Sequence, residues 1–107
     1  MSADTVTCSA KLWLWSGEGA GSWHFATVEG EAAEAISAHE AMRRLELGSG
    51  RGFGSVKVEA QIGDTNWKTS VFPNKQHGGW ILPVKAAVRK AEGIAAGDEV
   101  ELALTLL

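Results

Sequence analysis

Residues 55–62, SVKVEAQI, alternate apolar and polar side chains without a break. Val56, Val58 and Ile62 share one face of this segment, and its polar residues share the other. Such a period of two is typical of a strand with one buried and one solvated face. A slip of one residue would expose the whole apolar set, so the register is strongly specified. This segment is the clearest strand of the chain, and it favours a fold built around a sheet.

Further strands are predicted at residues 8–16, 22–28, 66–72, 80–84 and 99–107. In the first of these, Ala10, Leu12 and Leu14 share one face, and Lys11, Trp13 and Trp15 share the other. The inward alternation predicts one buried core, which contains Val56, Val58, Ile62, Val84, Val100, Leu102 and Leu104.

Two segments have helical character. Residues 31–46 are rich in Ala and Glu, and Ala35, Ile36, Met42 and Leu45 give a weak apolar stripe. Residues 85–94 predict a shorter helix that Gly93 ends. Strands and helices do not alternate regularly, so we expect a mainly β protein with two helices (α+β), a small β-barrel with helical caps.

The chain also contains a weak internal repeat. WHFATV, a helix and GSVKVEAQI are followed by WILPV, a helix and GDEVELALTL. Two such βαβ units predict a barrel with a pseudo-twofold axis, although alternating strands also resemble each other by chance.

Length and charge limit the class of protein. The chain has 107 residues, which fits a single domain over 1–107 with a loose segment at 1–7. It carries 10 basic and 13 acidic side chains, so nucleic acid is not expected as a partner. A lone cysteine, Cys8, and the absence of a signal-like or membrane-spanning run favour a cytoplasmic protein that is a monomer or weak dimer.

Three segments resemble a family of small bacterial proteins of unknown function: WHFATV, GSVKVEAQI and TSVFPNKQHGGWILPVKAAVRKAEGIAAGDEVELAL. That domain also occurs as the N-terminal part of YdeI/OmpD-associated-like proteins. The resemblance covers roughly residues 8–106. The run from Leu82 to Val100 is also similar to the Pro–helix–Gly-Asp pattern of AbrB/MazE-type regulators, which implies a double-split β-barrel. The family has no established activity to carry over.

One candidate ligand site can be assembled from the residues. Lys85 and Arg89 are four residues apart on the second predicted helix, so they share a face. With Trp67, Thr69 and Ser70 nearby, they are expected to border a shallow recess for an anion. The alternative is a solvated helix face without a ligand.

Other chemistry has less support. His24, His39 and His77 are too far apart for a metal-binding motif, and no cofactor motif or catalytic residue is predicted. The five tryptophans either plug the barrel ends under the helices or line a binding surface.

The leading hypothesis is therefore a non-enzymatic module that binds a small anionic ligand or an acidic protein surface. A nucleic-acid-binding regulator, by fold analogy with AbrB-like proteins, and an uncharacterised enzyme are the alternatives.

Overall fold

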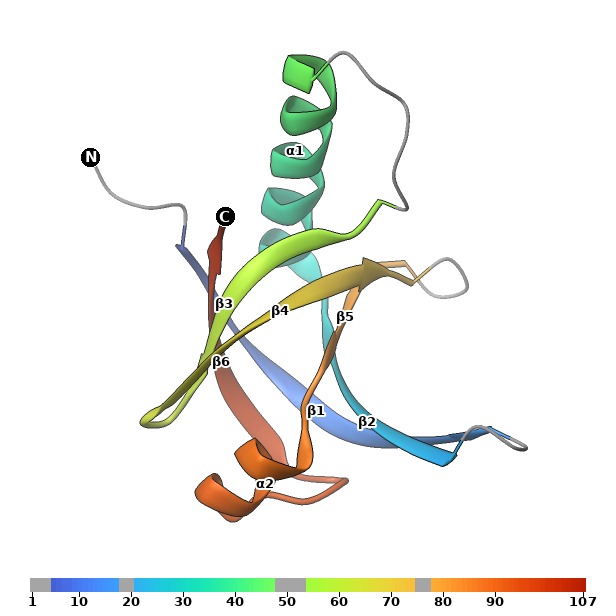
Figure 1. Cartoon of the computed structure of the whole chain (residues 1–107), viewed down its shortest axis with the longest axis vertical. Coiled ribbons are helices and arrows are strands. Elements are labelled where there is room, and N and C mark those ends of the chain that lie inside the picture. The colour runs from blue at the N-terminus through green and yellow to red at the C-terminus, as the bar shows by residue number, and fades with distance from the viewer. Residues whose placement is uncertain (1–4, 18–20, 48–53, 75–77) are drawn as a thin grey trace.

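The described residues of the computed structural model, 5–17, 21–47, 54–74 and 78–107, form six antiparallel strands that close into a barrel (Figure 1). In chain order the elements are β1 (Thr5–Gly17), β2 (Gly21–Val28), α1 (Gly30–Leu47), β3 (Val56–Ile62), β4 (Thr65–Pro73), β5 (Trp80–Pro83), α2 (Ala86–Glu92) and β6 (Glu99–Leu106). Around the barrel the strands follow the order β1-β2-β5-β4-β3-β6. The mainly β architecture with two helices is the one that the sequence predicted.

The strand order has an internal symmetry. If β1, β2, α1 and β3 are exchanged with β4, β5, α2 and β6, every neighbour relation is kept. The β1–β2 pair maps onto β4–β5, and the β1–β6 pair maps onto β4–β3. The β2–β5 and β3–β6 pairs map onto themselves. The repeat in the sequence therefore has a counterpart in the topology. The repeated unit is also longer than the sequence indicated, because it includes β1 before β2 and β4 before β5.

Two strands divide their length between two neighbours. β1 pairs with β6 as far as Lys11 and with β2 from Leu12 onward. β4 pairs with β3 as far as Val71 and with β5 only at Phe72 and Pro73. Within the described sheet, residues 5–11 of β1 pair with β6 alone, and residues 65–71 of β4 pair with β3 alone. Each of these segments therefore has one open backbone edge. α1 contacts β1 and α2 contacts β4, and the two helices lie at opposite ends of the barrel (Figure 1).

The core confirms the predicted register. Its fully buried large side chains include Leu12, Leu82 and Leu104, which come from three different strands. All seven residues predicted for the core are buried: Val56, Val58, Ile62, Val84, Val100, Leu102 and Leu104.

The first strand differs from the prediction at its start. β1 begins at Thr5, so residues 5–7 pair with β6 and are not part of a loose segment over 1–7; residues 1–4 lie outside the described residues. Leu14 shares its face with the buried Ala10 and Leu12 but is exposed. It pairs with His24, whereas the pairing of β2 with β5 begins only at Phe25, so this part of the β1–β2 hairpin extends past the end of β5.

The buried face of α1 contains only part of the apolar stripe seen in the sequence. Ala32, Ala33 and Ile36 are buried, whereas Met42 and Leu45 are 60% and 81% exposed. The helix leaves the barrel as it proceeds, so only its first turns have a sheet to pack against (Figure 1).

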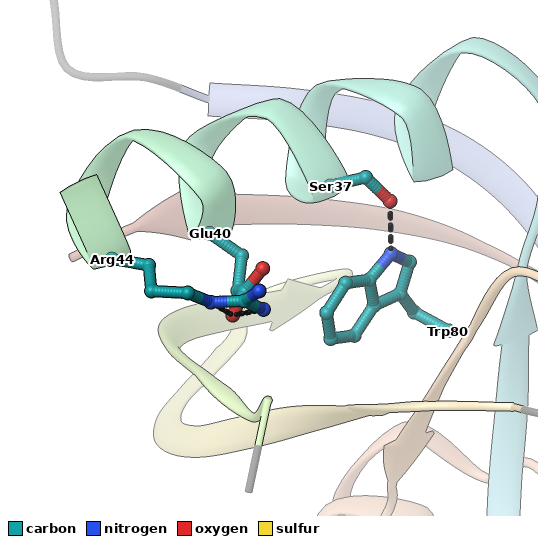
Figure 2. Close-up of polar contacts among 4 residues, drawn as sticks. All are labelled: Ser37, Glu40, Arg44 and Trp80. Carbon is teal, nitrogen blue, oxygen red and sulfur yellow. Dashed lines mark hydrogen bonds and ion pairs between the residues drawn. The ribbon is translucent and has the colours of Figure 1, made fainter. Parts of the chain in front are cut away.

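A tryptophan fixes α1 to the barrel. The indole Nε1 of Trp80 in β5 donates a hydrogen bond of 3.0 Å to Ser37 Oγ, and the Trp80 ring is 5% exposed (Figure 2). One turn further along α1, Glu40 and Arg44 form an exposed ion pair (Figure 2). Trp80 is therefore a tryptophan that plugs the barrel beneath a helix, as one of the two interpretations of the tryptophans expected.

Candidate functional site

A recess of about 800 Å³ lies where β4, the β5–α2 junction and the first residues of β2 meet. The five residues predicted to form a ligand site all line it: Trp67, Thr69, Ser70, Lys85 and Arg89. We call this hollow the cationic recess, because Lys57 and Lys68 line it together with Lys85 and Arg89.

The location of the recess follows from the open edge of β4. Trp67 and Thr69 lie on the inner face of β4, opposite Ala60 and Val58 of β3, whereas Ser70 lies on the outer face opposite Lys57. Side chains from both faces can line one hollow only where the strand lacks a neighbour on that side. β4 meets that condition before Phe72, because its pairing with β5 begins there.

The two predicted cations are placed by the start of α2. Lys85 is the N-cap residue, in an extended conformation, and Arg89 follows one turn later. Gly93 ends the helix in the left-handed conformation, with φ of 65°, and its N–H bonds to the Arg89 carbonyl oxygen. Only glycine adopts this conformation without steric cost, so the sequence signal for the helix end was correct.

The recess gathers positively charged side chains. Leu107, the last residue of the sequence, also lines it, and Lys68 lies opposite Glu59 in the β3–β4 register. Four of the chain's ten Lys and Arg residues line it, and no Asp or Glu lies among the described lining residues. Arg89 Nε donates to Val84 O at 3.2 Å, and Arg89 forms no ion pair with any carboxylate of the described residues. Glu92, the nearest acidic residue along α2, accepts a hydrogen bond from Thr65 Oγ1 instead.

His24 is a further polar residue of the recess. Its pKa is lowered from the ordinary value of 6.5, first because burial removes water from the imidazole and second because the positive charge of Arg89 lies close by. Sequence reasoning treated His24 as an ordinary strand residue and missed its place beside Arg89. It also missed Lys57 and Lys68, because the pairing of β3 with β4 had to be known before Lys57 could be placed next to Ser70.

A second hollow, of about 860 Å³, adjoins the first on the outer face of β1, β2 and β5. We call it the aromatic hollow. Its aromatic lining residues are Trp13, Trp15, Trp23, Phe25 and Phe72. Trp15 and Trp23 face each other across the β1–β2 hairpin, and Trp13 faces Phe25. Three tryptophans thus lie on the outside of the barrel.

The aromatic side chains are held in defined positions. Trp13 Nε1 donates to Thr27 Oγ1 at 2.8 Å, and the Trp13 and Phe25 ring centroids are 5.2 Å apart at a tilt of 43°. The Trp23 and Phe25 rings are 6.4 Å apart and almost parallel, at 8°. Trp23 is nevertheless 51% exposed, so the hollow presents aromatic surface to solvent.

The structure offers few positions for a metal ion. Within the described ranges, no group of three or more His, Cys, Asp and Glu side chains gathers in one place. His39 lies on α1 with Nε2 3.1 Å from Leu107 O, far along the chain from His24, and His77 lies outside the described residues. The helices of the described residues are also too short or too polar to cross a membrane.

The comparisons with known proteins identify a family and leave the function open. No curated protein matches the chain. One family model, described as a domain of unknown function (DUF1905), matches residues 9–104, which include all six strands in whole or in large part and both helices. The match covers the cationic recess and the aromatic hollow except for Leu107. The chain therefore belongs to the DUF1905 family of domains of unknown function.

Proposed function

We propose that this chain is a non-enzymatic binding module whose cationic recess holds a small anionic ligand. The observation that carries the proposal is the group of Lys57, Lys68, Lys85 and Arg89 around one hollow whose described lining contains no Asp or Glu side chain. Like charges brought together repel each other, by ~1 kcal/mol per pair at 4 Å in water and by more in a partly buried site. A bound anion attracts each of these cations, so the electrostatic energy of the recess becomes favourable.

The recess also has suitable hydrogen-bond donors. The guanidinium of Arg89 can donate two parallel hydrogen bonds to a phosphate or carboxylate, and the Ser70 and Thr69 hydroxyls lie in the same lining. Trp67 supplies an apolar wall and is 8% exposed. Charge-assisted hydrogen bonds are about twice as strong as those between neutral groups, so a doubly charged anion fits this set well.

The shape favours a small ligand over an acidic protein surface, since the cations line a concavity of about 800 Å³. Typical small-molecule sites occupy roughly 300–1,000 Å³. The regulator hypothesis rests on the likeness to AbrB-type proteins and on the symmetric topology. Against it stands a net charge of −3, with the cations gathered at one recess and not spread along a groove that could follow a phosphate backbone.

The test is a titration of the protein with sulfate and with inorganic phosphate, followed by tryptophan fluorescence. We expect saturable quenching that the Arg89→Ala substitution weakens by about tenfold or more, the cost of one lost charge-assisted contact. Lys90→Ala is the matched control, because Lys90 is an exposed cation of the same helix outside the recess. Thermal unfolding should show that both variants stay within about 1 kcal/mol of the parent.

Two results would contradict the proposal. Equal quenching in the Arg89→Ala and Lys90→Ala proteins would place the anion elsewhere. A tight, sequence-selective gel shift with DNA or RNA near physiological salt would favour the regulator hypothesis instead.

A further inference from the structure

The cationic recess and the aromatic hollow adjoin each other. Trp23 and Phe72 line both of them, so these two side chains form a shared wall. Trp23 lies next to His24 at the start of β2, and Phe72 lies two residues after Ser70 on β4. A ligand held by its acidic group near Arg89 would therefore extend along the shared wall into the aromatic hollow.

The aromatic hollow is built to receive a flat ring. Trp23 and Phe72 are 51% and 41% exposed, which is an unfavourable position for two large apolar side chains unless something covers them. The near-parallel planes of Trp23 and Phe25 offer a common orientation for a stacked ring. The hydrogen bond from Trp13 to Thr27 fixes the indole beside them, so little side-chain freedom is lost on binding.

Charge changes sign across the two hollows. The cations lie at the recess, whereas Glu29 lines the aromatic hollow and follows the last residue of β2. From His24 to Glu29 an extended chain covers roughly 17 Å. The carboxylate of Glu29 would repel a second phosphate group placed in the aromatic hollow. It therefore disfavours a polyanion that runs through both the cationic recess and the aromatic hollow. The pattern suits a ligand with one anionic end and one neutral ring.

On the basis of the proposed function, we propose that the ligand is a phosphorylated aromatic compound of the nucleotide class, with its phosphate in the cationic recess and its ring against Trp23 and Phe72 in the aromatic hollow. The four cations and two hydroxyls supply charge-assisted and neutral hydrogen-bond donors for the doubly charged phosphate monoester. Stacking on the shared wall supplies the affinity that the phosphate alone lacks.

The experiment compares three probes by isothermal titration calorimetry on the whole chain: adenosine 5′-monophosphate, ribose 5-phosphate and adenosine. The first carries both the ring and the phosphate, and each of the others carries one of them. We expect the monophosphate to bind about tenfold more tightly than ribose 5-phosphate, or ~1.4 kcal/mol, as stacking of one base on an aromatic side chain implies. Adenosine is expected to bind most weakly.

Variants separate the two parts of the site. Trp23→Ala should bring the affinity for adenosine monophosphate down to that for ribose 5-phosphate and leave the latter unchanged. Trp23→Phe, which keeps an aromatic ring, should restore most of the difference. Arg89→Ala should weaken both phosphorylated probes by the same factor. Trp23 lies on the part of the β1–β2 hairpin that extends past β5, so the two Trp23 substitutions should leave the core intact. Thermal unfolding of the variants would check this.

The outcomes distinguish this inference from the proposed function. If ribose 5-phosphate binds through Arg89 and the monophosphate binds no more tightly, the inference is wrong while the anion site stands. If neither probe nor inorganic phosphate binds, both are wrong. An affinity that rises steadily with the length of a single-stranded oligonucleotide would overturn the small-molecule ligand in favour of a nucleic acid.

Discussion

At the scale of single residues, the candidate site was predictable where it depended on local spacing. Lys85 and Arg89 are four residues apart, and the sequence shows that directly. Lys85 is the N-cap residue ahead of α2, whereas the sequence predicted it within the helix, and both side chains nevertheless line the recess. His24 and Lys57 reach the same recess only through strand pairing between segments distant in the chain. No local pattern contains that information, so these two residues could not be assigned from the sequence.

His24 leads to a prediction about pH. The unfolded chain takes up a proton at this residue near its ordinary pKa of 6.5, and the folded chain does so only at lower pH. The free energy of unfolding of the empty protein should therefore fall as the pH drops through this window. An anion in the recess favours the charged imidazole, so sulfate should bind more tightly as the pH drops.

Sulfate is the suitable probe, since its charge is constant over this range. Calorimetric titrations between about pH 7.5 and about pH 5.5 should show rising affinity in the parent protein and a flat profile in the His24→Gln variant. A slope that persists in His24→Gln would assign the effect to another group.

At the scale of elements, alternation predicted the strands because a half-buried strand places every second side chain in the core. All seven predicted core residues are buried for that reason. Apolar residues are exposed where an element continues past its packing partner. Leu14 extends beyond β5, and Met42 and Leu45 lie on the part of α1 that leaves the barrel. Periodicity shows which face an element would bury, but the length of the contact depends on the tertiary structure.

The contact that fixes α1 can be measured. Ser37→Ala removes the acceptor for the Trp80 indole N–H and leaves a buried donor without its partner. This loss should lower the free energy of unfolding by about 1–2 kcal/mol in urea denaturation. Glu40→Ala, on the same helix, breaks only an exposed ion pair and should cost about 0.5 kcal/mol or less. Equal effects of the two substitutions would mean that the Trp80 hydrogen bond does not hold the helix in place.

At the scale of the whole molecule, the two halves have the same strand order but different helices. α1 has 18 residues and α2 has 7, so the open edge of β4 has a much shorter helix beside it than the open edge of β1. The cationic recess lies at that edge. The repeat in the sequence predicted the symmetric order. The equivalent place beside α1 and β1 also has a hollow, of about 520 Å³, but Arg43 and Glu46 line it in place of four cations. The repeat does not extend to these charged side chains, so it could not predict this difference.

The net charge of the whole chain does not reveal how its charged side chains are distributed after folding. A net charge of −3 describes an acidic protein, yet four cations gather at one place after folding. The central claim is that this gathering is an anion-binding site, and the most direct measurement is a titration of the ¹⁵N-labelled protein with sulfate, followed by amide NMR shifts. We expect saturable shifts that are largest at Thr69, Ser70 and Arg89 and small along α1. Shifts that stay linear with sulfate, or that are largest at Arg43 and Arg44 on α1, would contradict it.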